Sequence, residues 1–138
     1  MQRISVWFLV AAATCMVVGV SMGIAMGILH DFHLAPVHAH LNLLGWASLG
    51  LMGLTYRAWP ELAAARGLAL TQFVLSTGAA VLFPIGIYLS IEHHQPMLAI
   101  GMAMVWLAGA VLFLARMVRL AVGRAPARGA ERVAVAAE

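Results

Sequence analysis

The first apolar run of the chain, Ile4–Leu29, reads ISVWFLVAAATCMVVGVSMGIAMGIL and contains no charged residue. Three further runs without Asp, Glu, Lys or Arg follow, at residues 32–56, 67–91 and 93–115. Each run reaches or exceeds the roughly 20 residues that a helix needs to cross a hydrocarbon core. Because backbone polar groups in lipid must be paired within their own segment, such runs predict helices. The sequence therefore predicts an all-α integral membrane protein, a four-helix bundle.

The composition agrees with this fold class. The chain is 64% apolar and 9% charged, whereas soluble domains are roughly 45–50% apolar. The first run is longer than the roughly 7–15 residues of a signal-peptide core, so we expect it to be a retained helix. A single cysteine, Cys15, excludes an internal disulfide. We expect one domain over residues 1–118, with helices at about 4–29, 36–58, 68–91 and 96–118, and a cytoplasmic basic tail at residues 119–138.

Small residues predict where the first two helices pack. Gly19, Gly23 and Gly27 recur at four-residue spacing in the first run, and Ala12 and Cys15 continue roughly the same face. In lipid, such stripes allow another helix to approach closely. The second run also has small residues on one side, at Gly45, Ala47, Gly50 and Gly53.

The charged residues predict the orientation in the membrane. All eight basic residues are arginines, and with four spans they lie on one side: Arg3, Arg57, Arg66, Arg116, Arg119, Arg124, Arg128 and Arg132. The last five are expected to follow the fourth span. Excess positive charge marks the cytoplasmic side, so both termini are expected there, in the inner membrane of a bacterium. The sequence pI near 10.0 then reflects topology, and no nucleic acid partner is expected.

The opposite, periplasmic face is expected to carry the remaining chemistry. It holds Asp31, Glu92 and all six histidines: His30, His33, His38, His40, His93 and His94. Ionisable groups at membrane level are costly and tend to mark function. Imidazole is the commonest protein ligand of transition metals and also binds haem iron. On an α-helix His40 points about 200° away from His38, so the two are not expected to bind one ion, whereas His38 and Asn42 share a face.

One segment carries a family resemblance. Residues 31–46, DFHLAPVHAHLNLLGW, are similar to small four-helix membrane proteins described as oxidase subunit I-like. The core HLNLL at 40–44, with LGLMGLTY at 49–56 and Pro60-Glu61, resembles the second helix of the catalytic subunit of nitric oxide reductase and other haem-copper oxidases. Gln72-Phe73 extends the likeness into the third run. The resemblance implies that this bundle is one unit of a haem-copper-oxidase-like arrangement.

The resemblance also implies a cofactor and an assembly. His40 would be an axial ligand of a b-type haem beside Asn42, and His38, or a histidine from His93 and His94, would complete the iron's ligands or orient His40. The family's copper ligands lie on later helices that this chain lacks, so one chain is not expected to hold a complete reaction centre or to be an enzyme alone. The family's pseudo-threefold arrangement of four-helix units implies a homo-oligomer, with a trimer favoured over a dimer. The expected role is electron transfer, haem handling or gas sensing.

Three other functions fit the same residues. A copper- or zinc-binding module would use the loop histidines His30, His33, His93 and His94. A cofactor-free accessory subunit of a respiratory complex would need no ligand. A metal-dependent hydrolase would use Asp31 or Glu92 as general base, but such a site needs several ligands and an open coordination position, and only two carboxylates exist on this face.

Overall fold

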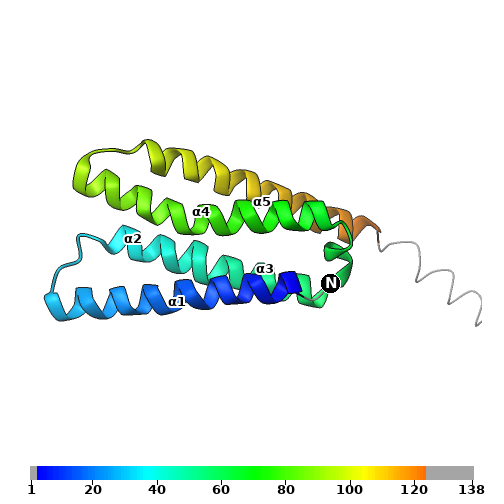
Figure 1. Cartoon of the computed structure of the whole chain (residues 1–138), viewed down its shortest axis with the longest axis horizontal. Coiled ribbons are helices and arrows are strands. Elements are labelled where there is room, and N and C mark those ends of the chain that lie inside the picture. The colour runs from blue at the N-terminus through cyan, green and yellow to red at the C-terminus, as the bar shows by residue number, and fades with distance from the viewer. Residues whose placement is uncertain (1–2, 124–138) are drawn as a thin grey trace, which may run out of the picture.

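The computed structural model describes residues 3–123, which form an antiparallel helical bundle with no strand in that range. Figure 1 shows two helical hairpins lying side by side, so the all-α prediction is confirmed. The second rod is a composite helix, Ala35–Ala58, built from α2, a π-helix and α3. The elements in order are α1 (Arg3–Leu29), α2 (Ala35–His40), the π-helix (Leu41–Ser48), α3 (Leu49–Ala58), a 3-10 turn (Pro60–Ala63), α4 (Arg66–His93) and α5 (Met97–Gly123).

Three of these helices, α1, α4 and α5, are long and apolar enough to cross a membrane. The composite helix is divided into shorter pieces, but its ribbon runs antiparallel to α1 as one rod (Figure 1). α5 continues to Gly123, past the expected end at residue 118. The rest of the expected basic tail, residues 124–138, lies outside the described residues.

Small residues bring α1 and the composite helix into close contact. A Cβ added at Gly53 would lie 3.1 Å from the Cβ of Phe8, and one added at Gly45 would lie 2.7 Å from the Sγ of Cys15. The predicted packing stripe of α1 is therefore confirmed over most of its length. It is wrong at Gly27, where an added Cβ would meet nothing within 4 Å.

The π-helix keeps the composite helix facing α1. At about 100° per residue, an unbroken α-helix would turn Gly50 about 120° away from His38. Bonding between residues five apart adds about one residue to the turn, which brings Gly50 back to within about 20° of that direction. The Ser48 hydroxyl follows the same spacing, donating to the Leu43 carbonyl at 2.8 Å. The sequence predicts an unbroken helix over residues 36–58, so this widened turn is a correction.

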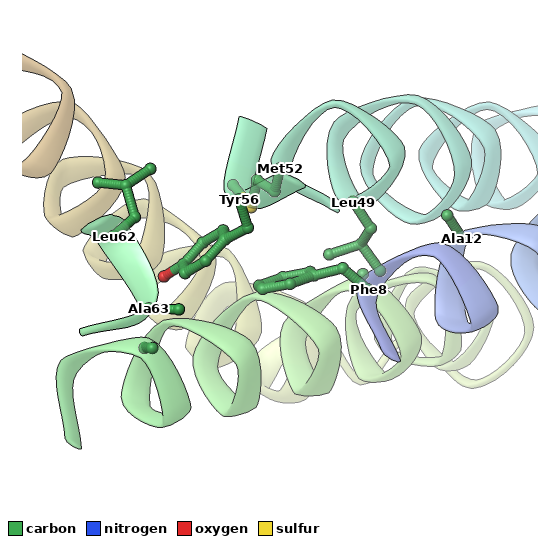
Figure 2. Packing of buried hydrophobic residues seen from close by; sticks show 9 residues of the cluster. Phe8, Ala12, Leu49, Met52, Tyr56, Leu62 and Ala63 are labelled. Atoms are coloured by element: carbon green, nitrogen blue, oxygen red, sulfur yellow. The ribbon is translucent and has the colours of Figure 1, made fainter. Parts of the chain in front are cut away.

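An aromatic cluster fills the bundle near the N-terminus of α1. Phe8 is fully buried, and its ring stacks on Tyr56 of α3 at a centroid distance of 5.4 Å. Phe8 also meets Phe73 of α4 edge to face, with 5.0 Å between the ring centroids. Figure 2 shows Leu49 and Met52 beside the rings of Phe8 and Tyr56, with Leu62 and Ala63 of the 3-10 turn at the end of the cluster. Three helices and a connection therefore share one core.

Arg116 corrects one part of the topology argument. It lies inside α5 and is 7% exposed, instead of following the last span at the membrane surface. Its guanidinium donates hydrogen bonds to the Tyr56 hydroxyl and the Leu62 carbonyl, and it lies over the Tyr56 ring at 5.1 Å. A buried charge is costly unless such partners surround it. Arg116 therefore ties α5 to α3 and the 3-10 turn.

A polar contact joins α4 to α5. Gln72 is fully buried, and its amide nitrogen donates to the Ser76 hydroxyl at 2.8 Å and to the Gly109 carbonyl at 2.9 Å. Interhelical hydrogen bonds of this kind contribute modestly in lipid, about 1 kcal/mol. Gly109 also leaves room for Ser76, since an added Cβ would lie 3.1 Å from the serine hydroxyl. Gln72 is thus a packing residue in this fold.

We expect Gly45→Ala to lower the thermal stability of the purified protein, because the added methyl overlaps Cys15 in the tight interface between α1 and the composite helix. Overpacking of this kind costs about 1–3 kcal/mol. Gly27→Ala is the matched control, since its Cβ enters open space and alanine favours a helix. Unfolding in detergent, followed by fluorescence-detected gel filtration, measures both. Equal losses in the two variants would contradict the packing described.

Arg116→Met should destabilise the bundle by about 3 kcal/mol, because it removes a charged group with two hydrogen bonds and leaves the buried Leu62 carbonyl unpaired. Arg119→Met removes the same charge from an exposed position one turn later and should change the unfolding temperature little. The same heating series compares them. A similar unfolding temperature for both variants would show that Arg116 is not a tie between helices.

Candidate functional site

All six histidines lie at or near one end of the bundle, which we call the histidine end. It carries the α1–α2 and α4–α5 connections, at the left of Figure 1. The α1–α2 connection contacts the last turn of α4, because His33 Nε2 donates to Glu92 Oε1 at 2.9 Å. The sequence prediction that these residues share one face of the protein therefore holds for the structure.

Two of the predicted metal-binding histidines end helices. His30 follows α1 with φ 52° and His94 follows α4 with φ 53°. Left-handed residues at these positions close helix C-termini, and histidine adopts them more readily than most residues. The Asp31 amide then bonds back to the Met26 carbonyl at 3.2 Å, and the Gln95 amide to the Leu89 carbonyl at 3.3 Å. His30 and His94 thus have a structural role that spacing alone did not reveal.

His33 is held between two carboxylates. Its Nδ1 donates to Asp31 Oδ1 at 2.8 Å, and its Nε2 donates to Glu92 Oε1. Ionised carboxylates only accept, so both contacts are satisfied together when the ring is protonated at both nitrogens, and the arrangement favours the imidazolium form. The hydrogen bond to Asp31, followed by that to Glu92, raises the pKa of His33. Bonds from the backbone and side chain of His33 lower the pKa of Asp31.

The predicted copper or zinc site gains no support from this arrangement. A doubly protonated His33 has no lone pair for a metal. His93, the last residue of α4, lies edge-on to Tyr88 with 6.3 Å between ring centroids. Within residues 3–123, no three His, Cys, Asp or Glu side chains are arranged to hold one metal ion. The hydrolase alternative has the same need for clustered ligands and therefore the same weakness.

His38 faces α1. Its Nδ1 donates to the Gly19 carbonyl at 2.9 Å, and its ring occupies the space beside Gly23, where an added Cβ would lie 2.9 Å from Cε1. Asn42 follows on the same side, filling the space over Gly19 and donating to the His38 carbonyl at 2.9 Å. The glycine stripe of α1 therefore provides the cradle for both polar side chains. The prediction that His38 and Asn42 share a face is confirmed.

His40 points away from α1, toward α4. Its Nδ1 donates to the Pro36 carbonyl one turn earlier at 2.7 Å. The ring lies edge-on to Phe83 of α4, with 4.9 Å between centroids, and is partly buried. Leu43, in the next turn, is 63% exposed, so the surface beside His40 is apolar and open. His38 and His40 therefore diverge, as helical geometry predicts.

The two rings share one chemical property. Each uses Nδ1–H to donate to a backbone carbonyl, so in the neutral ring Nε2 keeps its lone pair. Metal-binding histidines are usually held in this way, because the second hydrogen bond fixes the tautomer and the ring orientation. Of the two, His40 lies next to open surface, whereas His38 is wedged between helices. His40 is the better placed to accept an external ligand.

Some features of this region were not predicted. The π-helix begins at Leu41, directly after His40, and π-helical turns occur frequently at functional sites. No residue type signals it, although the offset between the glycines of the composite helix and those of α1 could have done so. The bond between His33 and Glu92 joins residues 59 positions apart, which the sequence could suggest only through the shared end of their helices.

Comparisons with protein-family models, with curated proteins and with solved structures give no match for this chain. The resemblance to haem-copper oxidases therefore rests on the quoted motifs alone.

The His33 contacts make a titration prediction. The raised pKa of His33 means that its contacts with the two carboxylates are fully formed below the ordinary histidine pKa and are lost as pH rises through the raised value. The lowered pKa of Asp31 means that the contribution of its carboxylate to these contacts is lost only at acid pH, as pH falls through the lowered pKa. The His33 ring resonance, followed by NMR across this window, should titrate above the ordinary histidine pKa.

Two variants rank the contacts of His33. Asp31→Asn should lower the His33 pKa more than Glu92→Gln does, because the Asp31 hydrogen bond is the larger cause of the shift. Because all three groups are solvent-exposed, added salt should also reduce the effect. An unchanged His33 midpoint in both variants would show that the carboxylates do not hold the ring.

Proposed function

We propose that this chain is a four-span membrane protein that binds haem b through His40 and acts in electron transfer, haem handling or gas sensing. The observation that carries the proposal is the bond from His40 Nδ1 to the Pro36 carbonyl, which leaves Nε2 free beside open apolar surface. Haem b supplies a redox-active iron, whose potential and open positions decide which of these roles applies.

The local contacts of His40 suit an axial ligand. Donation to a carbonyl makes the imidazole a stronger base and keeps the ring from rotating. The Phe83 edge limits the ring on the other side, at 4.9 Å. Leu43, in the next turn of the helix, is an exposed apolar side chain, which suits the flat apolar face of a porphyrin. The donor and its surroundings therefore fit the proposed group.

The proposed membrane placement follows from the helices and the arginines. α1, α4 and α5 are long enough to span, and the composite helix runs alongside α1. Arg3, Arg57, Arg66 and Arg119 lie at the end opposite the histidines, which the positive-inside rule assigns to the cytoplasm. The histidine end would then face the periplasm of a bacterial inner membrane. Arg116 is omitted from this argument because it is buried.

A homo-oligomer would complete the site. His40 offers one ligand at the edge of the bundle, and His38 is held on the other side of its helix. A second axial ligand and a cover for the porphyrin can come from another copy of the chain, arranged with cyclic symmetry. A trimer is favoured over a dimer, following the threefold arrangement that the family resemblance implies. A respiratory complex is a further candidate partner.

Haem supplied during expression should give the purified protein a Soret band that shifts on reduction, and His40→Ala should remove most of it, because the iron ligand is lost. His94→Ala is the matched control and should keep the band, since His94 only ends α4. Absorption spectra of oxidised, reduced and carbon monoxide-treated samples measure both. Full retention of the band in His40→Ala, or no band in the parent protein, would refute the proposal.

A further inference from the structure

A groove lies at the end of the bundle opposite the histidines, where α1 and α4 begin. Its volume is about 660 Å³, and it is open to the surroundings on one side. Arg3 and Arg66 form part of its rim, and the walls include Ile4, Trp7, Leu70 and Phe73. The groove therefore joins two cationic side chains to an apolar channel.

The polar rim suits an anion. Arg3 and Arg66 are both exposed, and within residues 3–123 neither makes an ion pair. α4 begins at Arg66 without a side-chain cap, so the first amide groups of the helix also point their partial positive charge toward this end. Two guanidinium groups and the N-terminus of α4 thus favour binding of an anionic group such as a phosphate.

The walls suit a hydrocarbon chain. From Arg66 to Phe73 the groove follows α4 for about 10 Å, at 1.5 Å per residue. Trp7 is 59% exposed, and tryptophan is enriched where membrane meets water. Cationic groups at the rim with an apolar channel directly below them match the order of headgroup and acyl chain in a phospholipid.

We propose that this groove binds one anionic phospholipid, with its phosphate between Arg3 and Arg66 and an acyl chain against Ile4, Leu70 and Phe73. A second copy of the chain is the less suitable occupant. A neighbour in the same membrane orientation would bring its own arginines to this level, while Glu61 is the single acidic residue at this end of the described chain. The inference depends on the proposed membrane insertion but not on haem binding.

Quenching of Trp7 by brominated lipid tests the groove. The full-length protein with Trp46, Trp59 and Trp106 replaced by Phe carries one fluorophore, at the groove. In nanodiscs, phosphatidylglycerol with brominated acyl chains should quench Trp7 at a lower mole fraction than brominated phosphatidylcholine does. Arg3→Gln/Arg66→Gln removes both charged hydrogen-bond donors from the groove and should abolish the difference.

Matched variants separate the groove from general surface charge. Arg57→Gln removes an exposed arginine at the same end that does not line the groove, and should keep the preference for phosphatidylglycerol. Arg3→Lys/Arg66→Lys should retain most of it, which shows that the double Gln variant acts through charge. A single-Trp46 protein should be quenched equally by both lipids, since Trp46 is exposed on the composite helix away from the groove.

Three outcomes would overturn the inference. Equal quenching of Trp7 by the two lipids, while Trp46 is quenched, would show an inserted protein without an anionic lipid site. Loss of the preference in Arg57→Gln would assign it to the overall charge of this end. No quenching of Trp7 by either lipid, with crosslinking between copies at Leu70→Cys, would show that a second copy covers the groove. Absence of quenching at Trp46 would instead refute membrane insertion, and with it the proposed function.

Discussion

The close contact between α1 and the composite helix is the constraint on which the rest of the structure depends. In lipid, helices gain little from hiding apolar surface, so they associate through tight van der Waals packing at small residues. Here the contact extends from Phe8 and Gly53 at one end to Gly23 and His38 at the other. The π-helical turn at Leu41–Ser48 makes that length possible, because it returns the later glycines to the α1 side.

The same contact selects the histidine that remains available for a ligand. His38 and Asn42 occupy the depressions over Gly23 and Gly19, and the bond to the Gly19 carbonyl holds the His38 ring there. Because the His38 side of α2 packs against α1, helical geometry directs His40 toward α4 and the surface. The packing of His38 therefore leaves His40 as the histidine open to a ligand, and the π-helix begins at the next residue, Leu41.

The two ends of the bundle are built on different electrostatic principles. At the histidine end, His33 joins the α1–α2 connection to the last turn of α4 through carboxylates that remain solvent-exposed, so this link responds to pH and salt. At the other end, Arg116 is buried and donates to the Tyr56 hydroxyl and the Leu62 carbonyl, so salt screens its contacts much less. Arg3 and Arg66, at the same end, are exposed and line the groove proposed to bind a lipid.

The all-helical fold, the approximate bounds of each helix and the separation of histidines from arginines could be predicted from the sequence, because uncharged runs of membrane length and charge position are local properties of the chain. The sequence also predicted that His38 and Asn42 diverge from His40, which follows from residue spacing alone. Four features could not be predicted in this way: Arg116 is buried, His30 and His94 end helices, His33 is shared by two carboxylates, and Leu41–Ser48 widens into a π-helix. Each of these depends on which surface of another helix lies opposite, and that is fixed by packing between segments distant in the chain.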